Sequence, residues 1–149
     1  SGLKLQLVLV AGGDDDLYNA FQNTDWYCPT QIYNYVDEMP AFVHAADAVI
    51  SKAGGLIVSE TLACGKPLLI TDVIEGQETG NARYVLENNA GARAQTPLAV
   101  LETVFHWLHN DAQQLQDLSA NAKEAGNPEA ASQIAKLVLS VDSLPQTNS

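Results

Sequence analysis

The sequence predicts an α/β fold: a Rossmann-like, doubly wound parallel sheet with helices on both faces. Three observations predict it. Apolar runs alternate along the chain with helix-like stretches, the connections between them are short, and the strand candidates are nearly continuous in apolar residues. Strands of a parallel sheet are buried on both faces and therefore read as apolar runs, while the crossovers between them are usually helices.

The first half of the chain holds three strand candidates, each followed by a helix candidate. The acidic residues 14–16 suit the start of the first helix, because carboxylates cap and stabilise helix N-termini. Asp37 is expected to cap a short second helix, and Gly65 to close the third. The three strand candidates are LKLQLVLVAGG at 3–13, QIYNYV at 31–36 and DAVISK at 47–52.

The second half continues the alternation and then becomes helical. KPLLITDV at 66–73 is the next strand, the helix that follows is expected to end at Gly91, and ARAQ at 92–95 is a last short strand. Pro97 suits the first position of another helix. Two further helices are expected at about 111–125 and 128–141. We therefore expect one domain at residues 1–141 and a flexible tail at 142–149.

Composition excludes several classes of function. The chain has 149 residues, 46% of them hydrophobic, and a formal net charge of −11. With 7 basic against 18 acidic residues there is no cluster to neutralise a nucleic-acid backbone, so no nucleic-acid partner is expected. No apolar stretch approaches the roughly 20 residues that span a bilayer, and no signal peptide is evident, so we expect a cytoplasmic location.

Cys28 and Cys64 form no metal or disulfide pattern and are expected to be buried.

The segment SKAGG, which follows the third strand, is a candidate anion site. Ligands of such sheets bind where strands end and helices begin. The amides of Gly54, Gly55 and Leu56 open a helix, and unpaired N–H groups with the helix dipole attract anions. Lys52 adds a positive charge suited to a diphosphate. A glycine pair at a strand-to-helix turn is equally compatible with a turn that binds nothing.

Two further polar features follow on the same predicted edge. Glu60 lies one to two turns into the helix, where a carboxylate can accept hydrogen bonds from ribose hydroxyls; a plain surface residue is the alternative. The segment IEGQETGNA at 74–82 places Gln77, Glu78 and Asn81 at the start of the next helix. Their mixed donors and acceptors suit sugar hydroxyls, although acids and caps are common at any helix start.

Metal binding and nucleophilic catalysis have weaker support in the sequence. Residues 14–16 fit a solvated helix start better than a metal site. His106 and His109 are three residues apart, yet no third ligand is evident. No nucleophile elbow is present.

Taken together, these motifs resemble a known family. The chain resembles the nucleotide-sugar-binding domain of GT-B glycosyltransferases of family 28 in the order of its features, which are a strand, SKAGG, Glu60, GKP and GQETGNA. The most similar branch is that of monogalactosyldiacylglycerol synthases and processive diacylglycerol glucosyltransferases. The resemblance runs from about residue 5 to residue 110. Glu75 and Gly55 stand where that branch usually has prolines.

The resemblance implies inverting transfer of a hexose from a UDP-sugar to a lipid such as diacylglycerol, with no cofactor and no metal. It also implies a preceding strand with a glycine-rich loop, and an N-terminal acceptor domain that holds the general base. The chain is then expected to be inactive alone, as part of a larger enzyme peripheral to a membrane. The implied contacts are uracil at Val36 and Met39, diphosphate at Ser51, Lys52, Gly54, Gly55 and Leu56, ribose at Glu60, and donor sugar at Gln77, Glu78 and Asn81.

Two alternatives remain at this point. UDP-GlcNAc 2-epimerase-like domains share a glycine pair, an acid in the following helix and a GKP strand, but the GQETGNA segment fits them poorly. A non-catalytic nucleotide-sugar-binding subunit or sensor is the other alternative.

Overall fold

The structure, a computed structural model, describes residues 4–141. By internal contacts the chain divides into two compact units, Ser1–Phe42 and Val43–Ser149. No described helix combines the length and the apolar character that crossing a bilayer requires.

The first unit is a pair of parallel strands with one helix between them. Strand β1 (Leu7–Val10) pairs with β2 (Thr30–Tyr33) in parallel, and α1 (Asp15–Gln22) connects them. As predicted, an acid begins this helix: the Asp14 carboxylate accepts a hydrogen bond from the Leu17 amide at 2.9 Å. Helix α2 (Met39–Ala45) starts in this unit and ends in the second.

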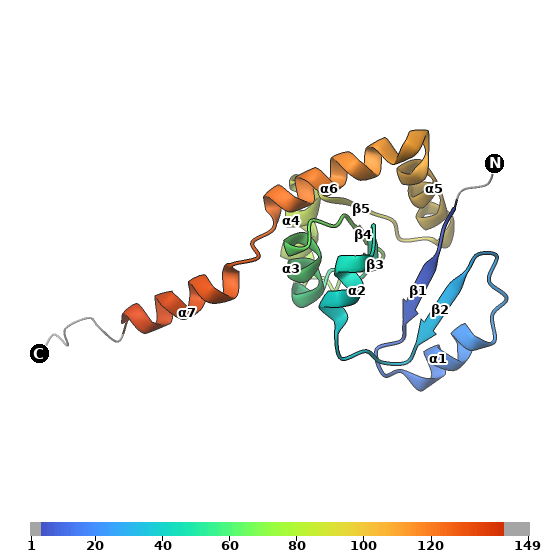
Figure 1. Cartoon of the computed structure of the whole chain (residues 1–149), viewed down its shortest axis with the longest axis horizontal. Coiled ribbons are helices and arrows are strands. Elements are labelled where there is room, and N and C mark those ends of the chain that lie inside the picture. The colour runs from blue at the N-terminus through green and yellow to red at the C-terminus, as the bar shows by residue number, and fades with distance from the viewer. Residues whose placement is uncertain (1–3, 142–149) are drawn as a thin grey trace, which may run out of the picture. The chain divides into compact units, whose positions relative to one another are not determined.

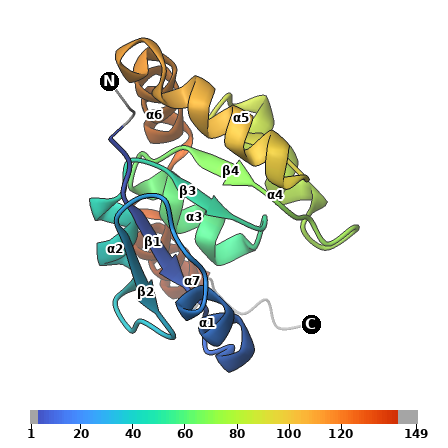
Figure 2. The same ribbon diagram turned by 90° about the vertical axis from the view of Figure 1, so that its right-hand side faces the viewer.

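The second unit contains a three-stranded parallel sheet with the order β3–β4–β5 (Figure 1). The strands are β3 (Val49–Ser51), β4 (Leu68–Ile70) and β5 (Gly91–Arg93). Figure 2 shows the same ribbon from the side. The remaining elements are α3 (Gly55–Ala63), α4 (Thr79–Glu87), α5 (Pro97–Leu108), the 3-10 turn η1 (Asn110–Ala112), α6 (Gln113–Ala125) and α7 (Ala130–Val141).

The central strand β4 explains why both faces of this sheet are covered. All three of its residues are fully buried. Leu68 and Ile70 pack in one hydrophobic cluster with residues of α3 and α4, whereas Leu69 packs in another with residues of α5. Helix α6 contributes to both clusters, with Ala122 in the first and Leu115 in the second. The predicted α/β class, with parallel strands and helices on both faces, is confirmed.

Four details differ from the sequence predictions. Helix α2 begins at Met39, so Glu38 and not Asp37 directly precedes it. The described strands form two sheets, β1–β2 and β3–β4–β5, rather than one. Cys28 and Cys64 are free but only half-buried. Helix α4 ends at Glu87, and the left-handed residue that follows is Asn89 rather than Gly91.

Gly91 has a different role, as the first residue of β5. A Cβ atom there would overlap the carbonyl oxygen of Leu68, its partner in β4. The glycine is therefore required by the close approach of two strands and not by a helix end. The predicted tail at 142–149 lies outside the described residues.

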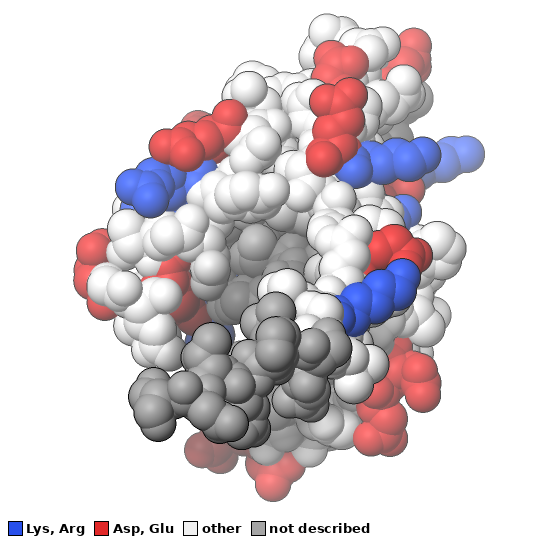
Figure 3. All heavy atoms as spheres, turned by 90° about the vertical axis from the view of Figure 1, so that its left-hand side faces the viewer, with Lys and Arg blue, Asp and Glu red and all other residues white. Residues whose placement is uncertain are grey.

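The surface reflects the acidic composition. On the face drawn in Figure 3, the few Lys and Arg side chains are separated by acidic and uncharged residues. Helix α7 exposes four large apolar side chains, each at least 60% accessible, namely Ile134, Leu137, Val138 and Leu139.

Candidate functional site

Among the residues that the structure describes, the first backbone amides of α3 have no hydrogen-bond partner, as the sequence predicts. Gly54 is the N-cap of α3 and has extended backbone angles, and no side chain caps the helix. The first helical hydrogen bond runs from the Val58 amide to the Gly54 carbonyl, at 3.0 Å. The amides of Gly54, Gly55 and Leu56 precede that bond and have no acceptor within the helix. A helix start of this kind can bind an anion, and binding at this one stays a prediction.

The glycine pair is not required by the fold of this unit. Neither Gly54 nor Gly55 has a positive φ. A Cβ atom on Gly54 would lie 3.7 Å from Glu78 Oε1, and one on Gly55 would lie 3.7 Å from Asn81 Nδ2, both ordinary contact distances. A side chain would fit at either position, so the backbone in front of α3 does not need glycine for its conformation.

Lys52 and Glu78 form an ion pair across this edge. The Lys52 ammonium lies 3.1 Å from Glu78 Oε1; 55% of the lysine side chain is exposed but only 6% of the glutamate side chain. The other carboxylate oxygen accepts a hydrogen bond from the Ile74 amide at 3.0 Å. This backbone hydrogen bond, assisted by Lys52, lowers the pKa of Glu78 against the opposing effect of burial. Glu78 therefore stays ionised at neutral pH.

Asn81 makes a second link to the same loop. Its side-chain amide donates a hydrogen bond to the Ala53 carbonyl oxygen at 3.0 Å, and Ala53 is fully buried. The start of α4 is thus tied at two points to the segment that carries the candidate anion site.

The remaining predicted residues do not link the two loops through their side chains. Glu60 is half-buried in α3 and Gln77 is exposed; neither side chain has a hydrogen bond or ion pair with a described residue. Ser51 ends β3, and Leu56 is 81% exposed. All of these belong to the second unit. Val36 and Met39, predicted at the uracil, belong to the first, as a half-buried connecting residue and the first residue of α2.

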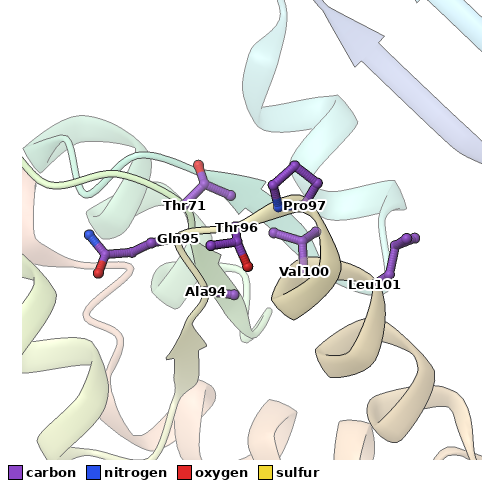
Figure 4. Close-up of a pocket in the computed structure, with 7 residues that line it drawn as sticks. All are labelled: Thr71, Ala94, Gln95, Thr96, Pro97, Val100 and Leu101. Atoms are coloured by element: carbon purple, nitrogen blue, oxygen red, sulfur yellow. The ribbon is translucent and has the colours of Figure 1, made fainter.

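Sequence reasoning missed the backbone partners of the site and one apolar concavity. The Ile74 amide and the Ala53 carbonyl have no sequence signal of their own. The concavity, of about 460 Å³, lies where β4 and β5 end and α5 begins (Figure 4). The i, i+3, i+4 spacing of Pro97, Val100 and Leu101 on α5 could have indicated it. No metal-binding group of three or more His, Cys, Asp or Glu occurs within the part of the chain that is described.

Comparison with known families gives one match over most of the chain. Residues 2–138 match the model of the glycosyltransferase family 28 C-terminal domain.

Several similar full-length proteins are plant enzymes. Monogalactosyldiacylglycerol synthase 3 of Arabidopsis thaliana is 33% identical over 131 residues, which is 88% of this chain and 28% of that protein. The monogalactosyldiacylglycerol synthase of Spinacia oleracea is 33% identical over 139 residues, 93% of this chain and 26% of that protein. Both relatives are described as chloroplastic. The chain thus spans less than a third of the length of these relatives.

Solved structures with a similar fold are also glycosyltransferases. VinC, determined in complex with DTDP, superposes with a TM-score of 0.58 at 12% identity, covering 88% of this chain and 41% of that one. SnogD from Streptomyces nogalater superposes with a TM-score of 0.56 at 15% identity, covering 92% of this chain and 44% of that one. At these identities the likeness shows the fold alone.

Proposed function

The chain belongs to the glycosyltransferase family 28 C-terminal domain family, and from this premise we propose that it is the donor-binding part of an inverting hexosyltransferase. The donor is a UDP-sugar and the acceptor is a membrane lipid such as diacylglycerol. The observation that carries the proposal is the uncapped start of α3, with Lys52 beside it and a glycine pair that the fold does not require. The relatives named as monogalactosyldiacylglycerol synthases support the lipid acceptor.

In the proposed assignment, each part of the donor has its own set of residues. The diphosphate binds at Ser51, Lys52 and the amides of Gly54, Gly55 and Leu56. Glu60 accepts hydrogen bonds from the ribose, and Gln77 binds hydroxyls of the hexose. Neither side chain has a hydrogen bond or ion pair with a described residue. Val36 and Met39 contact the uracil. A direct sugar contact by Glu78 stays a prediction, although both carboxylate oxygens already have a partner.

The proposed reaction is a direct displacement at the anomeric carbon. The acceptor oxygen forms the new bond to that carbon, the bond to the β-phosphate oxygen breaks, and its electron pair leaves with UDP. The amides at the start of α3 and Lys52 stabilise the charge that develops on the diphosphate, without a metal ion. A base outside this chain takes the proton of the acceptor hydroxyl. The chain alone then binds donor but transfers nothing, and the complete enzyme acts at a membrane surface.

The test is a titration of the chain with UDP, UDP-galactose and UDP-glucose, followed through backbone amide signals in NMR. We expect saturable shifts at Gly54, Gly55 and Leu56, and weaker binding by Glu60→Ala. Glu102→Ala is the matched control, because Glu102 is an exposed helical glutamate on α5. No shift at millimolar UDP, both in this chain and in a longer protein extended at its N-terminus, would contradict the proposal.

A further inference from the structure

The start of α4 holds the segment after β3 through side chains rather than through the backbone. Glu78 reaches Lys52 at 3.1 Å, and Asn81 reaches the Ala53 carbonyl at 3.0 Å. Both partners immediately precede Gly54, the N-cap of α3. Two independent contacts therefore join the two loops at the point where the candidate anion site begins.

The ion pair is asymmetric, and the asymmetry shows which partner orients the other. The Glu78 side chain is 6% exposed, and its Oε2 is fixed by the Ile74 amide at 3.0 Å. Its backbone amide also donates to the Ile74 carbonyl at 2.8 Å. Lys52 is 55% exposed and sits on a flexible four-carbon stem. The rigid, buried carboxylate thus orients the mobile ammonium.

The pair lies beside the amides that open α3. A Cβ atom on Gly54 would be 3.7 Å from Glu78 Oε1 and 3.8 Å from Lys52 Cε. An ammonium group has three N–H donors, and the bond to Glu78 uses one of them. With more than half of the side chain accessible, the other donors remain available to a ligand at the start of this helix.

We propose that Glu78 is a positioning residue that holds the Lys52 ammonium at the N-terminus of α3, so that its remaining donors bind the diphosphate of the donor. This inference rests on the proposed function and assigns the carboxylate a role through Lys52 instead of through a sugar hydroxyl. Holding the side chain in place before binding removes part of the cost of ordering it when the diphosphate arrives.

A double-mutant cycle tests this role. Lys52→Met, Glu78→Gln and the double variant are titrated with UDP and, separately, with uridine, which lacks the diphosphate. We expect each single substitution to weaken UDP binding, by about two- to tenfold for Glu78→Gln. The double variant should bind UDP as Lys52→Met does, because Glu78 acts only through Lys52. Uridine binding should be unchanged in all three variants.

Several outcomes would overturn the inference while leaving the proposed function intact. Additive losses would mean that Glu78 acts independently of Lys52. Weaker binding of UDP-galactose by Glu78→Gln with unchanged UDP binding would mean a direct contact with the sugar. Unchanged or tighter UDP binding would mean that Glu78 does not position Lys52 or that it competes with the diphosphate for it. If neither the wild-type chain nor a longer protein extended at its N-terminus binds UDP or uridine, the proposed function is refuted, and this inference with it.

Folding is checked in each variant through its thermal unfolding midpoint and amide spectrum. If Glu78→Gln does not fold, Glu78→Asp takes its place in the cycle. Aspartate keeps the charge but is one methylene shorter, so it draws the carboxylate away from Lys52, and the same expectations apply.

Discussion

The two units of the chain differ in how much of their structure is buried, although both contain parallel strands. In the second unit, β4 is fully buried between two hydrophobic clusters. In the first, α1 has no buried residue, and Ala11 is the only buried hydrophobic residue among those described there. A sheet of two strands with one helix excludes little water, whereas a third strand creates a central strand that can be covered on both faces.

The difference extends to the candidate site. In the second unit, Lys52, Glu78 and Asn81 are held by specific contacts next to well-packed elements. The residues predicted at the uracil, Val36 and Met39, belong to the less buried unit. We therefore expect the segment that holds Lys52, Glu78 and Asn81 to unfold locally less readily than the segment that holds Val36 and Met39.

The substitution with the largest expected effect tests the close approach of β4 and β5 in the second unit. Gly91→Ala places a methyl group against the Leu68 carbonyl, so we expect the free energy of unfolding to fall by about 3 kcal/mol or more. Urea unfolding monitored by circular dichroism measures it. Gly80→Ala is the control, because Gly80 is an exposed position of α4 with open space around it; there alanine should stabilise by about 0.5–1 kcal/mol. Equal effects of the two substitutions would contradict the account of β5.

A matched pair of valines compares the two units directly. Val85 in α4 is fully buried and Val8 in β1 is 46% exposed. Val85→Ala should lower the free energy of unfolding by about 2–3 kcal/mol through lost burial and a cavity, and Val8→Ala by less than about 1 kcal/mol. Urea midpoints and slopes of the two variants give the comparison. Similar losses would show that the first unit has a core comparable to that of the second.

The smallest expected effect is a loss of stability in acid that depends on the Glu78 carboxylate. Because the pKa of Glu78 is lowered in the folded chain, the ionised form contributes stability above the unfolded pKa, and this contribution is lost as pH falls through the folded pKa. Between about pH 6 and pH 3, the wild type should therefore lose more stability than Glu78→Gln does. Thermal midpoints at a series of pH values measure the difference. Parallel pH curves for the two proteins would mean that Glu78 contributes nothing of this kind.

Much of the fold was predictable because its signals are local. Apolar runs located the strands, an acid at residue 14 and a proline at residue 97 located two helix starts, and Gly65 has the left-handed conformation expected after α3. Caps and periodicity depend on residues within a turn or two of one another, so they can be read without knowing which strands pair. The polar residues at the ends of β3 and β4 were identified for the same reason.

The sequence by itself thus determined the α/β class, the order of the elements and the segments that carry the candidate site. Tertiary structure decided the division into two sheets, the requirement for glycine at residue 91, and the pairing of Lys52 with Glu78 and of Asn81 with Ala53. The last three features join residues more than twenty positions apart, and they depend on β3, β4 and β5 lying side by side. Contacts of that kind depend on which strands are neighbours and how closely they approach, and no local pattern of residues encodes either.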